Sequence, residues 1–282
     1  MKNVAINVNI NNYNASPFDT INSIKKAGFT NIFINWKNYV GKDGTIITGE
    51  EQFMYAKNKG LNVIFVHLLC PRMFEVWDEN TTLEFDKKFE VFKKDIDDCQ
   101  RCGIHLAVMH INGGWETESH ITDVGLNRLQ DMINYANNKG ITIAMENANS
   151  LPGGYLESAI TNLTCKNFGI CYDSGHANCN PYGTKMNFSL FKDKILAVHL
   201  HDNHGKFENG PNGEDRDEHL FPFDGNVDWN NILKNLKNCN YQGPVTLELH
   251  YDKPYLNMTI DEFYAKAYEL AKKLEDMSNI IK

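Results

Sequence analysis

The sequence predicts an α/β fold, a single (β/α)8 TIM barrel that spans residues 1–282 as one domain. Strand-like and helix-like segments alternate from one end of the chain to the other, which is typical of a parallel sheet wrapped in helices. The strand-like segments are continuously apolar, as strands covered on both faces should be. A doubly wound open sheet is the alternative, but Asn7, Asn9 and Asn11 stand where that fold needs a glycine-rich phosphate turn.

Eight short apolar segments are predicted to be the strands. They are VAINVNI from Val4, NIFINW from Asn31, NVIFVHLL from Asn62, IHLAVMHI from Ile104, ITIAME from Ile141, FGICYD from Phe168, ILAVHLH from Ile195 and PVTLEL from Pro244. Helices are predicted over residues 17–27, 49–59, 83–102, 122–139, 154–162 and 228–239, and from 259 almost to the end. Ser16-Pro17 supplies a cap and first turn, and a glycine stops each of the first four helices: Gly28, Gly60, Gly103 and Gly140.

One segment interrupts this alternation. Residues 202–226 are too long and too rich in glycine and asparagine for an ordinary connection between a strand and a helix. Such loops at a catalytic face are usually lids or binding loops. This loop also carries Asp217-Glu218-His219, a possible further pair of metal ligands.

Six successive predicted strands, from the third to the eighth, end in residues that can bind a metal ion. The strand C-termini of a parallel barrel open at one mouth, so these side chains are expected to converge. They are His67, His110, Glu146, Asp173 with His176, His199 with His201, and Glu248 with His250. Because scattered residues would not fall at the same place in every strand, the pattern indicates a metal-centred active site.

Each of these residues has a plainer interpretation when it is taken alone. A lone His67 or His110 is more often a hydrogen-bonded core histidine. Glu146 and Glu248 are different, because a carboxylate that ends a buried strand needs a partner to offset its desolvation. Four other residues are interpreted as rim or surface residues, although the tryptophans could stack on a substrate: Trp36, His105, Trp115 and His250.

The sixth and seventh predicted strands leave the ligand choice partly open. After Asp173, the Ser-Gly turn lets the side chains of Asp173 and His176 face one ion. His199 and His201 lie two residues apart, so both can face the barrel interior, although only one need be a ligand.

The expected ligands are histidine, aspartate and glutamate without cysteine, a set that suits Zn, Mn, Co or Mg. No organic cofactor is expected. Glu146 and Glu248 end strands that are three apart in a ring of eight, so they approach the centre from roughly opposite sides. Two such carboxylates could remove a proton on one face of a substrate and return it on the other. The metal would polarise the carbonyl and stabilise the enediolate.

Composition narrows the function further. A net charge of −8 argues against a nucleic-acid partner, because backbone binding favours a basic surface. Seven scattered cysteines and no basic-then-apolar leader suggest a reducing cytoplasm. Cys99 and Cys102 have the spacing of a metal or redox pair, but no second pair accompanies them. No apolar run reaches the roughly 20 residues of a membrane span.

Five motifs resemble the xylose isomerase-like TIM-barrel superfamily, which includes sugar and sugar-phosphate isomerases and epimerases and the AP endonuclease family 2. The motifs are MEN (145–147), YDSGHA (172–177), VHLHDN (198–203), DEH (217–219) and LELH (247–250). In its ketose 3-epimerase branch, one divalent metal, often Mn or Co, is held by a set that maps here to Glu146, Asp173, His199 or His201, and Glu248.

That branch also implies roles for other residues. The two glutamates exchange the proton, and His176 touches the substrate. An arginine expected soon after the strand-seven histidine is not obvious, and Phe207 lies near its place.

The resemblance to the endonuclease IV branch implies a different site, in which nine ligands hold three zinc ions. Those ligands map to His67, His110, Glu146, Asp173, His176, His199, Asp217, His219 and Glu248. The loops that would meet DNA are acidic here, as in ENGPNGEDRDEH.

The sequence therefore leads us to expect a cytoplasmic, metal-dependent sugar or sugar-phosphate isomerase or epimerase that acts on a small carbohydrate. Glu146 and Glu248 are its expected catalytic residues. Expected substrate contacts are His67, His110, Trp115, His176 and His201. A trinuclear-zinc phosphodiester hydrolase is the alternative, and a sugar-binding barrel with a structural metal is a third interpretation.

Overall fold

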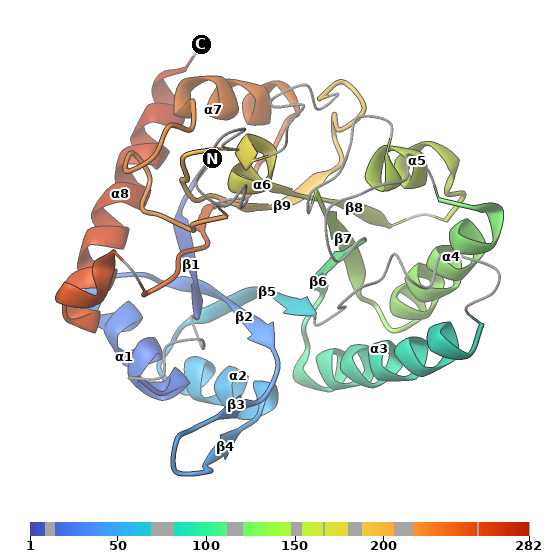
Figure 1. Ribbon diagram of the computed structural model, residues 1–282, viewed down its shortest axis with the longest axis horizontal. Helices are drawn as coiled ribbons and strands as arrows, with labels where there is room; N and C mark the ends of the chain where they lie inside the picture. The colour runs from blue at the N-terminus through green and yellow to red at the C-terminus, as the bar shows by residue number, and fades with distance from the viewer. Residues whose placement is uncertain are drawn as a thin grey trace, which may run out of the picture.

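The computed structural model describes residues 1–8, 15–68, 82–111, 121–147, 154–165, 167–179, 188–205, 217–252 and 254–281. Eight parallel strands form one sheet in the order β10-β1-β2-β5-β6-β7-β8-β9 (Figure 1). The strands are β1 (Val4–Val8), β2 (Asn31–Trp36), β5 (Asn62–Leu68), β6 (Leu106–His110), β7 (Thr142–Glu146), β8 (Phe168–Asp173), β9 (Ile195–His199) and β10 (Val245–Leu247).

The sheet curls into a barrel, and its two edge strands meet at a short seam. Leu200, just after β9, forms a parallel bridge with Leu247 of β10. The Leu200 N–H donates to the Thr246 carbonyl at 2.9 Å, and the Glu248 N–H donates to the Leu200 carbonyl at 3.2 Å. The predicted (β/α)8 TIM barrel is confirmed.

Helices cover the outside of the barrel (Figure 1). They are α1 (Pro17–Ala27), α2 (Gly49–Asn58), α3 (Thr82–Cys102), α4 (Asp123–Asn138), α5 (Tyr155–Asn162), α7 (Trp229–Asn238) and α8 (Ile260–Ile280). The short helix α6 (Ser174–Cys179) lies instead at one end of the barrel (Figure 1). Ser16 forms a capping box with Asp19, and Gly28 ends α1 at a φ of 109°, where a side chain would be strained. Among the described residues, none of the helices is long and apolar enough to cross a membrane.

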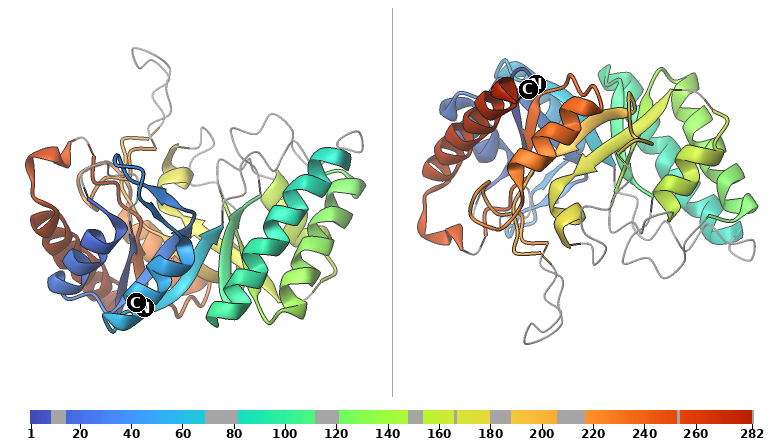
Figure 2. Two further views of the ribbon diagram at one scale, coloured as in Figure 1. Left: turned by 90° about the horizontal axis from the view of Figure 1, so that it is seen from below. Right: turned by 90° about the horizontal axis from the view of Figure 1, so that it is seen from above.

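Three local features differ from the sequence prediction. A hairpin of β3 (Tyr39–Val40) and β4 (Ile46–Ile47) follows β2. The chain after Asp173 forms the short helix α6 rather than a simple turn. Strand β10 ends at Leu247, so Glu248 follows the strand instead of ending it. In both views of Figure 2, α6 lies at the end of the barrel opposite the two termini.

The core has two parts. A large cluster fills the space between the strands and the helices. A second cluster lies inside the barrel and forms the floor beneath the strand C-termini; it consists of Phe33, Phe65, Val108, Ala144, Cys171 and Ala197, and is called the barrel floor below. Because the floor is packed with side chains, the barrel is not a pore, and polar chemistry is confined to its mouth.

Candidate metal centre

The strand ends bring the predicted ligands to one rim. His67 lies one residue before the end of β5, and the last residues of β6, β7, β8 and β9 are His110, Glu146, Asp173 and His199. His110 pairs with Glu146 in the sheet register, and Asp173 pairs with His199. Parallel pairing in register therefore places these side chains at the same height. Their roles as ligands and catalysts stay predictions.

Glu146 lies at the centre of this rim and is 1% exposed. Its Oε2 lies 2.9 Å from His67 Nε2, 3.2 Å from His110 Nε2 and 3.4 Å from His199 Nδ1. Its Oε1 lies 3.0 Å from His176 Nδ1. Burial raises the pKa of this carboxyl, but His110 and His199 outweigh burial and hold the pKa well below its usual range.

Four side chains at the ends of adjacent strands form the largest group of potential ligands among the described residues. One ligand atom each of Glu146, Asp173, His199 and Glu248 lies within 4.8 Å of the others, and all four residues are buried. His199 Nδ1 is 3.2 Å from Glu248 Oε2 and 3.9 Å from Asp173 Oδ2. Burial lowers the pKa of His199, whereas Cys171, Glu248 and Glu146 raise it, and the net pKa lies well above the ordinary value.

Asp217 organises a neighbouring group. Its Oδ2 lies 3.2 Å from His176 Nε2 and 3.1 Å from His219 Nε2. Burial lowers the pKa of His219, but Asp217 outweighs it and raises the pKa to about 9. His67, His110 and Glu146 form a third group, with ligand atoms within 4.8 Å of one another.

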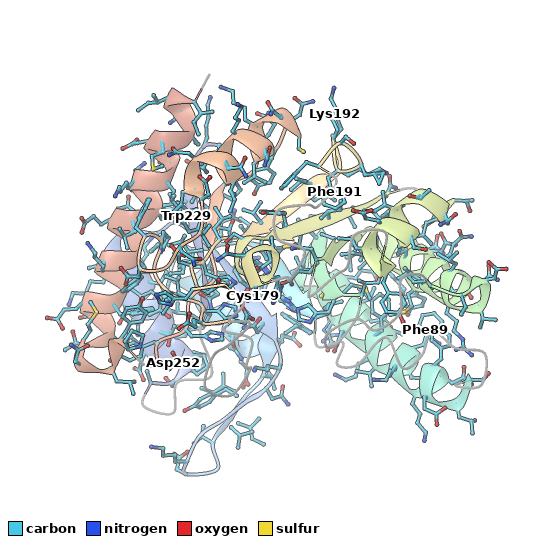
Figure 3. All side chains as sticks on the ribbon, turned by 45° about the horizontal axis from the view of Figure 1, so that its top comes forward. Phe89, Cys179, Phe191, Lys192, Trp229 and Asp252 are labelled. Carbon is cyan, nitrogen blue, oxygen red and sulfur yellow. The ribbon has the colours of Figure 1, made fainter. Side chains whose placement is uncertain are left out.

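The segment that carries Asp217 and His219 is held in place by Asp202, which is fully buried. Asp202 Oδ1 accepts from the Val227 N–H at 3.0 Å, and Oδ2 accepts from the Phe223 N–H at 2.8 Å. Oδ2 also accepts from the indole N–H of Trp229 at 3.0 Å; Trp229 begins α7 and is labelled in Figure 3. Sequence reasoning missed this residue, although its place directly after two strand-end histidines is a usable signal.

The two histidines of the seventh predicted strand are placed differently. His199 faces the four-residue group, whereas His201 Nε2 lies 3.1 Å from Asp173 Oδ1 and 3.6 Å from Asp217 Oδ1. The His201 ring stacks on His219 with centroids 3.9 Å apart, and His219 stacks on His250 at the same separation. His201 thus contacts Asp173, and it also offers a ligand atom within 4.8 Å of those of His219 and Glu248, so both His199 and His201 stay possible ligands. His250, expected at the rim, packs against His219.

Several polar atoms at this rim are buried and make no well-aligned hydrogen bond to a described residue, although some lie close to a charged neighbour. They are Glu146 Oε1, His176 Nδ1, both ring nitrogens of His199, and His201 Nδ1. Buried polar atoms are normally paired, so a group of unpaired nitrogen and oxygen atoms fits the coordination of a cation. Imidazole and carboxylate ligands suit Zn, Mn, Co or Mg. The donor atoms therefore fit a divalent metal.

Other residues of interest fall elsewhere. Trp115 and Phe207 lie outside the described residues. Sequence reasoning also missed Cys171 on the barrel floor, where burial raises the pKa of its thiol to about 12.

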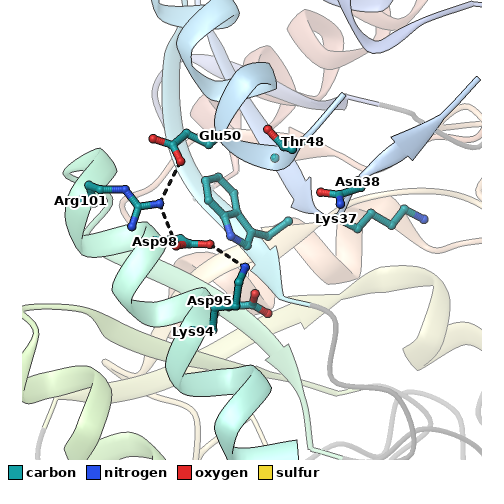
Figure 4. A pocket seen from close by; sticks show the side chains of 10 residues that line it. Lys37, Asn38, Thr48, Glu50, Lys94, Asp95, Asp98 and Arg101 are labelled. Atoms are coloured by element: carbon teal, nitrogen blue, oxygen red, sulfur yellow. Dashed lines mark hydrogen bonds and ion pairs between the residues drawn. The ribbon is translucent and has the colours of Figure 1, made fainter. Parts of the chain in front are cut away.

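A cavity of about 330 Å³ is lined by Trp36 and by charged residues of α2 and α3 (Figure 4). Four of its charged side chains form ion pairs: Arg101 with Glu50 at 2.9 Å and with Asp98 at 2.8 Å, and Lys94 with Asp98 at 3.2 Å. None of the predicted ligands lines it.

Comparison with known proteins places the chain among barrels of this type. The sequence model of the xylose isomerase-like TIM barrel family matches residues 22–274. A curated relative, an uncharacterised protein of Sinorhizobium fredii, is 35% identical over 109 residues, which is 39% of this chain and 32% of that protein. The matched segments span 32–44% of the length of the curated relatives.

Solved structures share the fold over nearly the whole chain. The IOLI protein with a bound zinc atom has a TM-score of 0.73 at 18% identity, covering 100% of this chain and 99% of that one. D-allulose 3-epimerase from Methylomonas sp., in complex with D-allulose, has a TM-score of 0.71 at 16% identity, with 96% of each chain covered. At these identities, the likeness shows the fold alone.

Proposed function

This chain belongs to the xylose isomerase-like TIM barrel family, and on that premise we propose that it is a metal-dependent sugar or sugar-phosphate isomerase or epimerase. The observation that carries the proposal is the group of Glu146, Asp173, His199 and Glu248, whose ligand atoms lie within 4.8 Å of one another. Two proteins of this fold, the IOLI protein with a bound zinc atom and the Methylomonas D-allulose 3-epimerase in complex with D-allulose, support a metal and a carbohydrate for this chain. The six described cysteines are free thiols, in keeping with the reducing cytoplasm.

The two glutamates are the proposed acid and base. Glu146 ends β7 and Glu248 follows β10, three positions away around the barrel. Both carboxylates approach His199 Nδ1, Glu146 Oε2 at 3.4 Å and Glu248 Oε2 at 3.2 Å. One carboxylate takes the proton next to the substrate carbonyl, and the other returns it at the opposite face. Glu248 is the more exposed of the two, 8% against 1%, so a substrate reaches it first.

A divalent ion held by these four residues would supply Lewis-acid chemistry, because it would polarise the carbonyl and stabilise the negative charge left by the proton. The surrounding histidines bind and orient the carbohydrate. His110 exposes 33% of its side chain at the mouth, which suits a hydrogen bond to a sugar hydroxyl. His176 lies between Glu146 and Asp217, where it can hold a second hydroxyl. His67 and His201 complete the proposed contacts from the described residues.

Metal content and a sugar panel test this proposal. Elemental analysis of protein purified without chelator should find one divalent ion per chain, and the loaded protein should interconvert a ketose with its epimer or an aldose. Stripping the ion should abolish turnover, and restoring it should recover turnover. A protein that binds no ion, or a loaded protein that converts no ketose, aldose or phosphorylated sugar, would contradict the proposal.

One observation favours a second candidate, a trinuclear-zinc phosphodiester hydrolase. Besides the four-residue group, His67 and His110 meet Glu146, and Asp217 lies between His176 and His219. Those three groups could hold three ions. Three zinc ions per chain and cleavage of abasic-site DNA would favour the hydrolase. Asp217→Asn separates the two candidates, because it should abolish hydrolysis but leave the ion of a one-metal isomerase in place.

A further inference from the structure

The imidazole of His199 rests on the barrel floor. Its ring stacks on Phe33 with centroids 4.8 Å apart and planes 15° apart, and Phe65 lies 5.8 Å away. Both aromatic residues belong to the floor, as do Val108, Ala144 and Ala197. These five side chains offer no hydrogen-bonding atom to an imidazole. The sixth residue of the floor, Cys171, is the one described member with a heteroatom.

The two nitrogens of the His199 ring have different surroundings. Nδ1 faces the carboxylates of Glu146 and Glu248 at 3.4 Å and 3.2 Å. Nε2 is buried as well, and neither ring nitrogen makes a well-aligned hydrogen bond to a described residue. The Cys171 sulfur is fully buried and lies within 4.8 Å of a ring nitrogen of His199 and of a Glu146 oxygen. Because Cys171 lies two residues before Asp173 in β8, both side chains point into the barrel, the cysteine one step below the carboxylate.

We propose that the Cys171 thiol pairs with His199 Nε2. This contact would hold the ring so that Nδ1 faces the other three members of the four-residue group, Glu146, Asp173 and Glu248. This inference rests on the proposed metal-dependent function. A histidine that binds a metal usually donates its other N–H to an acceptor, and that bond fixes the orientation of the ring. A thiol can accept or donate a weak hydrogen bond, so it can pair with Nε2 whichever ring nitrogen carries the proton. On this proposal Cys171 is a positioning residue, whereas Glu146, Cys171 and His199 also form a group that could hold a metal directly; the Co²⁺ measurement below decides between the two roles.

Substitutions of Cys171 test the proposal through metal affinity. Cys171→Ala removes the heteroatom and leaves a small cavity, and Cys171→Val removes the heteroatom but adds one heavy atom to the buried side chain. Each should weaken Mn²⁺ or Zn²⁺ binding about 10- to 100-fold in a chelator competition. Cys171→Ser restores a donor and acceptor and should recover most of the affinity. Val108→Ala, a cavity on the same floor without loss of a heteroatom, is the matched control and should leave affinity near that of the wild type.

A second readout does not depend on the metal. In metal-free protein labelled with ¹⁵N-histidine, the ring nitrogens of His199 can be assigned from the signals lost in His199→Gln. Cys171→Val should shift the Nε2 signal, and Val108→Ala should not.

The outcomes separate this inference from the proposed function. Unchanged affinity and an unchanged Nε2 signal in Cys171→Val would overturn the positioning role, even if the wild-type protein binds its ion. If the wild type binds no ion, the proposed function fails, and the Nε2 signal alone decides whether Cys171 pairs with His199. Sulfur-to-metal charge-transfer absorption in the Co²⁺-loaded wild type would show direct ligation and would also overturn the positioning role.

Discussion

The imidazole of His201 occupies the space where Gly175 would carry a side chain. A Cβ added at Gly175 would come within 1.8 Å of His201 Cε1, far closer than any real contact. The Nε2 of the same ring lies 3.1 Å from Asp173 Oδ1. The missing side chain of Gly175 thus lets His201 reach the carboxylate that faces the metal group.

Gly175→Ala should therefore displace His201 from Asp173. We expect a loss of about 1–3 kcal/mol in the free energy of unfolding, the usual cost of overpacking a core. Urea denaturation measures this loss, and chelator competition should show weaker metal binding in the same variant. The double variant Gly175→Ala/His201→Ala removes the clash, so it should be more stable than Gly175→Ala alone. If adding His201→Ala makes the protein less stable instead, the proposed clash is wrong.

The two glutamates should respond differently to the same substitution. Glu248→Gln should lower turnover about 10²- to 10⁴-fold, the usual contribution of an acid–base group, with little change in stability. Glu146→Gln should lower turnover and should also lower the free energy of unfolding by about 3 kcal/mol, because the buried carboxylate balances the charge of the histidines around it. Steady-state kinetics on the sugar found in the panel and urea denaturation provide the two measurements. Full activity in Glu248→Gln would remove that residue from the mechanism.

Asp202 should prove essential to the loop that carries Asp217. Asp202→Ala leaves the N–H groups of Phe223, Val227 and Trp229 without their acceptor. We expect this to lower the free energy of unfolding by about 3 kcal/mol. Hydrogen exchange should become faster over residues 217–229 than over the rest of the barrel.

Asp228→Ala is the control for Asp202→Ala. Asp228 caps α7 from the same segment, so its loss should cost only about 1 kcal/mol. Equal losses in the two variants would mean that Asp202 has no special role.

Asp95 should make stability depend on pH in a direction unusual for a carboxylate. Burial beside the cavity of Figure 4 raises the pKa of Asp95 from 3.8 to about 6. The folded protein then binds the Asp95 proton more tightly than the unfolded chain does. The contribution of this proton to the free energy of unfolding is therefore complete below pH 3.8 and is lost as pH rises through about 6.

Asp95→Asn should remove that dependence. At pH 8, we expect the free energy of unfolding of Asp95→Asn to exceed that of the wild type by on the order of 1 kcal/mol, after allowance for solvent screening. At pH 4 the gain should disappear. Asp86→Asn, at an exposed position of the same helix, is the control and should show no such difference. Urea denaturation at both pH values measures the effect, and an equal change at pH 4 and pH 8 would contradict it.

The barrel was predictable because its strands and helices are encoded locally, by apolar runs, caps and glycine stops. The meeting of His110 with Glu146, and of Asp173 with His199, follows from the same topology, because parallel strands in register bring their ends together. The contacts of Asp202 depend on residues 21 to 27 positions away, and no local pattern encodes them. The hairpin β3–β4 was missed for a different reason: two-residue strands are too short for periodicity to detect.

The four-residue group of Glu146, Asp173, His199 and Glu248 spans the seam of the barrel, so a metal bound there would also affect the closure of the sheet. Among the described residues, β9 and β10 are joined by the bridge of Leu200 to Leu247, and His199 and Glu248 flank that bridge on opposite edges. A cation bound to both side chains would act as a clasp that keeps the last edge of the sheet shut. The free energy of metal binding would then add to the stability of the contact between β9 and β10. In the metal-free protein, local unfolding would begin by separation of these two strands.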